Sequence, residues 1–247
     1  MPLDCPIDRS HTYRPLQLST LPDFTTFSSL LRVTREYQVL DTRRRLLELV
    51  CIAYPESFEG FTLSKCLGES AFGEPIPHPN RVLKLFVQQE LTAALPVAYY
   101  MAIRGGLDSL MDMDPPQDVA LPPEVLRSAT RGLVMLREVE LNETHNLILG
   151  VKNFHPCSAS SCPSRSQTRS AVLEAQQKAF ERTVSSLEFG TKILQVPNFY
   201  EDHVSDSEHA SPSTCRGCVE KWESGHEELR RKAWEMLPHV FGLGLNP

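Results

Sequence analysis

The chain has 247 residues, of which 41% are hydrophobic and 23% are charged, so it can bury a sizeable core and is not disordered throughout. Its net charge of −6 argues against a protein that reads nucleic-acid phosphates over a broad basic face. No apolar run reaches the roughly 18 residues that a membrane span needs, and the first residues lack the pattern of a secretory signal. We therefore expect an intracellular protein, cytoplasmic or nuclear, with no membrane partner.

The N-terminal part of the chain predicts a leader followed by two helices. Residues 1–24 hold four prolines and no sustained periodicity, which predicts a poorly ordered leader. From Asp23 the pattern turns helical, and after a break Asp41 is the predicted N-cap of a second helix that ends before Pro55. The positions of the first helix that recur at helical spacing are Phe27, Leu30, Leu31 and Thr34.

Two features of the second predicted helix invite a functional interpretation. Arg43 to Arg45 form either a basic patch or a solvated helix face, and the acids Asp41 and Glu48 beside them favour the solvated face. Cys51 lies in an apolar run, which predicts a buried thiol that acts as a small apolar group.

The middle of the chain alternates loops and helices. Residues 55–80 are rich in glycine and proline, and Gly68–Gly73 has the glycine spacing of a phosphate-binding loop without the Lys-Ser/Thr pair that such a loop requires. Helices are predicted from Arg81 and from Pro96, the second ending at Gly105. Both are apolar nearly all round and should be buried.

The C-terminal half predicts three further helices. One opens at Pro123, and Gly132 inside it costs about 1 kcal/mol relative to alanine unless another group packs there. An amphipathic helix is predicted over 166–194, an acidic exposed loop over 196–214, and a last helix over 219–238. Because no alternation is long enough for a sheet, the predicted fold is all-α, an irregular multi-helix bundle.

Four of the seven cysteines form two closely spaced pairs, Cys157 with Cys162 and Cys215 with Cys218. An odd number of cysteines without a secretory signal argues against a disulfide framework and for a reducing compartment. Two thiolates at short spacing can point at one metal ion, so the two pairs together predict a four-cysteine clip that holds a structural zinc ion.

Other interpretations of these pairs stay open. His155, His203 and His209 are spare ligands if one thiol lies out of reach. The 52 residues between Cys162 and Cys215 are too many for a compact zinc finger, so a shared site requires the intervening helix to bring the chain back. If it does not, the second pair is a redox-labile or simply packed pair, and the first two cysteines are unrelated.

The chain carries no recognisable catalytic motif. His226 to Arg230 begins like the helical zinc-protease motif but ends in arginine where the second histidine is required. Neither the Gly-x-Ser-x-Gly elbow of hydrolases nor the Gly-x-Gly-x-x-Gly fingerprint of dinucleotide-binding proteins occurs. We therefore expect that the protein is not an enzyme.

Several segments resemble a large fungal family of BTB/POZ-domain proteins. Residues 30–39 and 53–60 look like the last helical hairpin of the BTB domain, and residues 90–100, 121–126 and 234–243 look like the helical region that follows it. The closing Trp-x-x-Leu-Pro-x-x-Phe-Gly-Leu of the last segment is the most specific of these motifs.

The resemblance implies a truncated BTB/POZ-like protein with three parts: the leader 1–24, a helical hairpin over 25–60 and a C-terminal helical domain over 61–247. The strands and dimer-forming helices that open a BTB domain have no counterpart in residues 1–26. Proteins of this family recruit partners such as cullin ubiquitin-ligase scaffolds or transcriptional corepressors. The resemblance transfers no catalytic residue.

The sequence as a whole favours a non-enzymatic protein–protein interaction module, without naming the protein partner. The resemblance, the lack of a catalytic motif and the acidic loop 196–214 support this expectation. The alternative is a zinc-binding, nucleic-acid-associated regulator. Its support is a weak basic patch between Cys157 and Arg169, which holds two arginines and no acid, so a nucleic acid is not the expected partner.

Overall fold

The computed structural model describes residues 22–63, 72, 77–104, 106–110, 116–152, 194 and 216–244. In chain order the elements are α1 (Phe24–Glu36), α2 (Leu40–Ala53), α3 (Phe58–Leu63), α4 (Pro79–Gln89), the 3-10 turn η2 (Thr92–Ala94), α5 (Leu95–Ile103), α6 (Gly106–Leu110), α7 (Pro123–Lys152) and α10 (Arg216–Val240). Within these ranges no β-sheet occurs, so the predicted all-α class is confirmed. The loop predicted over 196–214, and the helix predicted over 166–194 apart from Leu194, lie outside the described residues, as does the leader up to residue 21.

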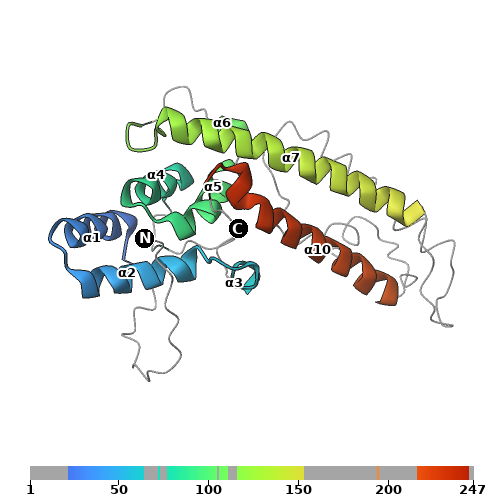
Figure 1. The fold of residues 1–247 in the computed structure, drawn as a ribbon, viewed down its shortest axis with the longest axis horizontal. Helices are drawn as coiled ribbons and strands as arrows, with labels where there is room; N and C mark the ends of the chain where they lie inside the picture. Colours follow the sequence, from blue (N-terminus) through green and yellow to red (C-terminus); the bar gives the residue numbers. More distant parts are fainter. Residues whose placement is uncertain are drawn as a thin grey trace, which may run out of the picture.

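Helix α5 lies at the centre of the described helices (Figure 1). It packs against α4 on the side of the α1–α2 hairpin, and against α6, α7 and α10 on the other side. Every residue of α5 except Met101 is buried, as its uniformly apolar sequence predicts. Helices α7 and α10 contact each other and run side by side away from α5.

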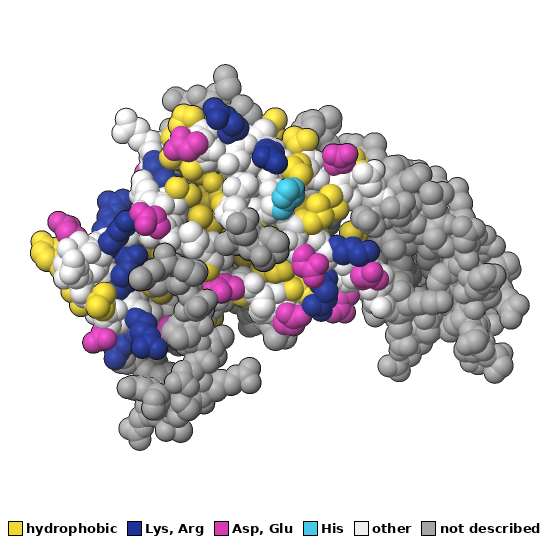
Figure 2. Space-filling view, in the orientation of Figure 1, with side chains coloured by type: hydrophobic (Ala, Val, Ile, Leu, Met, Phe, Trp, Pro, Cys, Tyr) yellow, Lys and Arg dark blue, Asp and Glu magenta, His cyan; other side chains and the backbone are white. Residues whose placement is uncertain are grey.

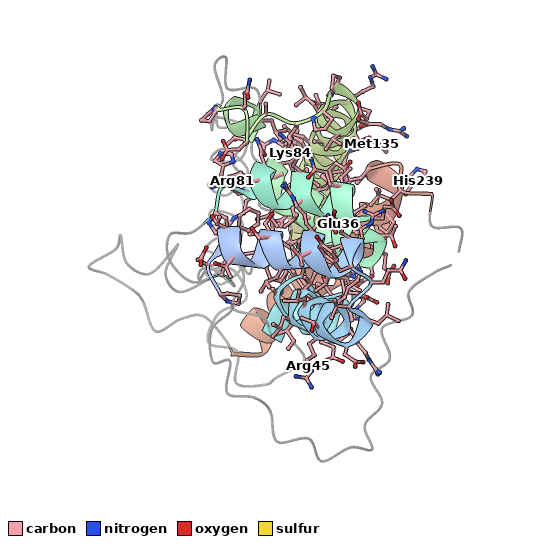
Figure 3. The ribbon with its side chains drawn as sticks, turned by 90° about the vertical axis from the view of Figure 1, so that its left-hand side faces the viewer. Glu36, Arg45, Arg81, Lys84, Met135 and His239 are labelled. Carbon is pink, nitrogen blue, oxygen red and sulfur yellow. The ribbon has the colours of Figure 1, made fainter. Side chains whose placement is uncertain are left out.

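Helix α4 buries one face only, so the predicted burial on all sides is wrong for this helix. Its outer face carries Arg81 and Lys84 (Figure 3). The Arg81 guanidinium pairs with the Asp118 carboxylate at 3.0 Å, and the Lys84 ammonium donates to the Gln117 carbonyl at 2.8 Å. The polar residues of α4 therefore hold the linker that precedes α7.

The start of α1 follows the capping rule and the start of α2 does not. The Asp23 carboxylate accepts hydrogen bonds from the Thr26 hydroxyl at 2.6 Å and the Thr26 backbone N–H at 3.0 Å, and these bonds lower the pKa of the Asp23 carboxyl. Asp41 is not the N-cap of α2, because this helix already begins at Leu40 after Val39. Asp41 instead lies in the first turn, where a carboxylate interacts favourably with the helix dipole.

Helix α10 does not end at Pro238, as predicted, but runs on to Val240. A proline lacks the backbone N–H that would donate to the carbonyl four residues earlier. In the last turn of a helix this loss affects few further hydrogen bonds, so the helix can continue through Pro238. Gly242, with φ at +67°, ends the helix instead, and the Leu243 N–H donates to the Pro238 carbonyl at 2.9 Å. The glycine, which tolerates the left-handed conformation, is the stop signal here.

Gly132 of α7 allows another group to pack closely against the helix, as a glycine inside a helix suggested. The Phe241 ring packs directly on it, and a Cβ at position 132 would overlap that ring. The Phe241 ring also stacks on the ring of Tyr99 in α5, with centroids 4.8 Å apart and planes inclined by 17°. The last residues of the described chain therefore close the core between α5 and α7.

Candidate protein-interaction surface

Helix α1 carries two apolar stripes, and only one of them faces the core. The buried positions are Phe24, Phe27, Leu31 and Thr34. The exposed stripe consists of Leu30 and Val33 of α1 and of Tyr37, the residue that directly follows the helix. These three positions follow the i, i+3, i+7 spacing that places side chains on one helix face. Of the four positions that the sequence shows at helical spacing, Phe27, Leu31 and Thr34 are buried and Leu30 is exposed.

A tight turn joins α1 to α2 and holds the next residues in place. Gln38 has φ at +54°, the left-handed conformation that usually belongs to glycine. The Val39 N–H donates to the Thr34 carbonyl at 3.0 Å and the Gln38 N–H to the Arg35 carbonyl at 3.4 Å, which is the hydrogen-bond pattern of a Schellman motif. This geometry fixes where Tyr37 and Leu40 lie relative to each other.

The end of the hairpin concentrates exposed apolar side chains. Among the residues whose burial the structure describes, seven large apolar side chains are exposed, and five of these lie within residues 30–40. We name these five the hairpin surface: Leu30, Val33, Tyr37, Val39 and Leu40. Tyr37 and Leu40 are 70% and 73% exposed. The two exposed apolar side chains elsewhere, Ile52 and Val134, lie singly.

Two arginines of the hairpin reach the C-terminal end of α4 and anchor the hairpin there. The Arg35 guanidinium donates to the Gln88 carbonyl and to the Glu90 carboxylate, each at 2.7 Å. Arg43 lies close to the Leu31 carbonyl and to Gln89, at 3.4 to 3.5 Å. The carbonyls at a helix C-terminus lack partners within the helix and carry partial negative charge, so guanidinium groups stabilise them.

The other three arginines of the hairpin, Arg32, Arg44 and Arg45, are exposed, as Arg35 is. Arg44 follows Leu40 by one helical turn, on the same face of α2, and pairs with Glu48 at 3.5 Å. Within the described part of the chain, Arg32 and Arg45 make no ion pair, and Arg45 points away from the body of the molecule (Figure 3). The solvated face predicted for Arg43 to Arg45 is therefore confirmed for the last two and wrong for Arg43.

The hairpin thus differs in charge from the rest of the molecule. Residues 30–45 hold five arginines and two acids, in a chain whose net charge is −6. Figure 2 shows hydrophobic side chains at the outer tip of this end, beside a group of Lys and Arg side chains. The hairpin surface therefore consists of exposed apolar side chains in a segment rich in arginine, a composition suited to binding another macromolecule.

The predicted zinc site falls almost wholly outside the described residues. Cys157, Cys162 and Cys215 lie outside them, as do the spare histidine ligands, and Cys218 lies in α10 without a described side chain. Among the side chains that are described, no three His, Cys, Asp or Glu residues gather as a metal site would require. The four-cysteine clip and its zinc ion stay a prediction.

Arg230 and Cys51, two other residues that the sequence singled out, make contacts within the fold. Arg230, which spoils the zinc-protease motif, is buried in α10, where its Nε donates to the Leu194 carbonyl at 3.1 Å. The Tyr100 hydroxyl accepts the Leu194 N–H at 3.3 Å, and burial raises the pKa of this phenol far above its usual value. Cys51 is half-buried rather than buried, with its Sγ 3.7 Å from the Glu56 carboxylate.

The sequence contained a signal for the hairpin surface that its interpretation missed. The apolar positions of α1 cover two adjacent stripes, more than a helix needs to pack on a single core.

None of the helices described is both long and apolar enough to cross a bilayer. Comparison of the chain with known protein families, with curated proteins and with solved structures finds no match.

Proposed function

We propose that this chain is a non-enzymatic protein–protein interaction module that binds a partner protein at the hairpin surface. The observation that carries the proposal is the gathering of five exposed apolar side chains within eleven consecutive residues. Single exposed apolar residues are ordinary on protein surfaces, whereas several exposed apolar side chains in one short segment are typical of interaction sites. The resemblance of the same segment to a hairpin of BTB/POZ-domain proteins, which act by recruiting partners, supports the proposal.

The hairpin is also suited to binding because it is held in place before any partner arrives. Arg35 and Arg43 attach it to the end of α4, and the left-handed Gln38 fixes the turn. A preformed surface loses little conformational entropy on association, so more of the contact energy appears as affinity. Tyrosine is enriched among the residues that contribute most to interfaces, and Tyr37 lies at the centre of this segment.

The first test is a site-specific cross-link in cells that make the protein. A photoreactive p-benzoylphenylalanine replaces Tyr37 in one variant and Ile52 in a second, and mass spectrometry identifies the cross-linked proteins. Ile52 is a matched control because its side chain is 71% exposed but lies outside the hairpin surface. We expect a defined cross-linked partner from position 37 and none in common from position 52. Equal products from both positions would contradict the proposal.

The second test reconstitutes the complex from the purified partner. The double variant Tyr37→Ala/Leu40→Ala should weaken the Kd by about 30-fold, the effect of losing about 2 kcal/mol from an interface hot spot. Ile52→Ala should leave the Kd unchanged. A double variant that binds as tightly as the wild type would remove the hairpin surface from the interface.

A further inference from the structure

We propose that Tyr100 and Arg230 form a binding site for the carboxyl terminus of a peptide that ends in leucine, a site that the chain fills with its own Leu194. Tyr100 belongs to α5 and Arg230 to α10, so the site is separate from the hairpin surface. Three features support the proposal: the way in which Leu194 is held, a guanidinium nitrogen that Leu194 leaves without an acceptor, and the charges nearby.

Leu194 is held as a bound peptide residue would be, through both its backbone and its side chain. Its N–H donates to the Tyr100 hydroxyl at 3.3 Å, and its carbonyl accepts from Arg230 Nε at 3.1 Å. Its side chain is fully buried within the hydrophobic core. We name Tyr100, Arg230 and the pocket that holds this side chain the Leu194 site. Its two polar partners lie 94 and 36 residues away in the chain, so the site binds the leucine through tertiary contacts and not through a local turn.

The Leu194 carbonyl satisfies only half of the guanidinium edge that binds it. Nε and Nη2 lie on the same edge of the Arg230 guanidinium, where they form a fork of two donors that matches the two oxygens of a carboxylate. Nη2 is buried and has no hydrogen-bond partner among the described residues. A terminal leucine carboxylate would engage both nitrogens, whereas an internal leucine offers one carbonyl oxygen, as Leu194 does.

The guanidinium is held in place for such a ligand. Arg230 is only 6% exposed, and the Phe58 ring of α3 lies 5.3 Å from its Cζ, a distance at which the ring stabilises the cation. Burial lowers the pKa of the Arg230 guanidinium, because desolvation disfavours its charged form. A carboxylate that pairs with this charge would compensate for the lost hydration.

None of the described carboxylates supplies that counter-charge. Glu227 is close enough to act on the Arg230 guanidinium, but it forms its ion pair with Arg231, at 3.7 Å. The Glu227 side chain is 61% exposed, so water screens its charge. Arg230 therefore keeps a positive charge that an anionic ligand can pair with.

The charges at the Tyr100 end of the site are also positive in sum. Arg104, Arg230 and Glu140 act on the Tyr100 phenol. The Glu140 carboxylate is itself paired with the Arg137 guanidinium at 3.2 Å. An anionic occupant is therefore favoured over a neutral or cationic one.

A peptide must displace Leu194 before it can bind. Its apparent affinity therefore falls with the fraction of molecules in which the Leu194 site is open. In return, the exchange replaces a hydrogen bond to a neutral carbonyl with two charge-assisted hydrogen bonds, which are shorter and stronger. A terminal leucine is thus a better occupant of this site than the internal leucine of the chain.

The experiment measures binding of the full chain to a fluorescein-labelled Ala-Ala-Ala-Leu peptide with a free carboxylate, by fluorescence anisotropy. The same peptide with a terminal carboxamide should bind about 10- to 100-fold more weakly, because it lacks the charge and the second oxygen. A peptide of four alanines with a free carboxylate should bind about tenfold more weakly, because it leaves the leucine pocket unfilled.

Three outcomes of these peptide measurements would overturn the inference. The first is equal affinity for the acid and the carboxamide, and the second is equal affinity for the leucine and alanine termini. The third is displacement of the peptide by an equal concentration of inorganic phosphate, which would show a site for small anions without a leucine pocket. All three measurements use the wild type, so they decide the question even if a variant does not fold.

Two substitutions with matched controls test the residues of the site. Arg230→Lys keeps the charge but removes the fork, and should weaken the Kd of the leucine peptide by about tenfold. The control Arg131→Lys, at an exposed arginine of α7, should leave the Kd within about twofold. Equal Kd values for the two variants would remove Arg230 from the site.

The last test removes the occupant that the chain supplies. Leu194→Ala should bind the leucine peptide about tenfold more tightly than the wild type, because it vacates the pocket. Leu237→Ala, at another fully buried core leucine, should not bind it more tightly. Unchanged or weaker binding to Leu194→Ala, or no binding to either Leu194→Ala or the wild type, would overturn the inference.

Discussion

The hairpin surface and the junction of α5, α7 and α10 use the same kinds of side chain for different purposes. At the junction the Phe241 ring is 1% exposed and lies between Gly132 and Tyr99, so every face of it is covered. At the hairpin, Leu31 is buried while its neighbour Leu30 is exposed. Apolar residues at the junction stabilise the fold, whereas the exposed ones of the hairpin are available to a partner. Substitutions should therefore separate the two regions, through stability in one and binding in the other.

The sharpest division within the hairpin lies between its two adjacent leucines. Leu31→Ala should lower the free energy of unfolding by about 2–5 kcal/mol, because it leaves a cavity under α1. Leu30→Ala should lower it by about 1 kcal/mol or less, because that side chain already contacts water. Urea denaturation followed by circular dichroism measures both. Equal losses would mean that the exposed stripe belongs to the core.

The next largest effect is expected at the junction. Gly132→Ala should lower the free energy of unfolding by about 1–3 kcal/mol, although alanine favours a helix, because the added methyl group must displace a ring that is stacked on Tyr99. The double variant Gly132→Ala/Phe241→Leu should lose less free energy of unfolding than the sum of the two single losses, because the smaller leucine leaves room for the added methyl group. Additive losses would show that the methyl group and the ring do not meet.

A smaller effect with a pH signature is expected at Tyr100. Tyr100→Phe should cost about 1 kcal/mol at neutral pH, because the Leu194 N–H loses its buried acceptor. The folded protein keeps the phenol protonated where the unfolded chain ionises it, so the wild type loses stability as the pH rises above about 10, by up to about 1.4 kcal/mol per pH unit for each such tyrosine. The variant should lose less over this range. Tyr99 remains in both proteins as an internal reference, since burial also raises the pKa of its phenol.

The smallest effect is a gain, at the turn that presents the hairpin surface. Gln38→Gly should raise the free energy of unfolding by about 0.5–1 kcal/mol, because glycine adopts the left-handed conformation without strain. As a control, Arg32→Gly in the helical part of α1 should lower it by about 1 kcal/mol. A loss at Gln38 as large as the control would mean that this residue makes contacts that stabilise the turn. Thermal unfolding resolves differences of this size.

Local chemistry in the sequence was sufficient to predict much of the fold. Asp23, Pro96 and Pro123 lie in or next to the first turns of their helices, as capping and proline geometry require. Gly132 signalled a close approach without showing that Phe241 makes it, since the two residues are distant in the chain. The direction of each stripe of α1 depends in the same way on where α4 packs, which no local pattern encodes.

The candidate site was only partly visible for the same reason. The sequence drew attention to Arg43, Arg44 and Arg45 as a group, but Arg43 turns toward the Leu31 carbonyl of α1 and the Gln89 carbonyl at the end of α4. Helical spacing placed Leu30 together with Phe27, Leu31 and Thr34 and did not separate the exposed stripe from the buried one. The short spacing within each cysteine pair is also a local pattern. Whether the two pairs come together depends on residues outside the described ranges.

The uniformly apolar character of α5 has a consequence for how the chain reaches its folded state. The residues that cover α5 include Phe241, and the contact of Glu59 with Arg231 already joins positions 172 residues apart. Contacts of such long range form slowly, because a large loop must close first. Until α10 arrives, α5 exposes apolar surface that invites aggregation, so we expect chains shortened before α10 to depend on chaperones or to precipitate.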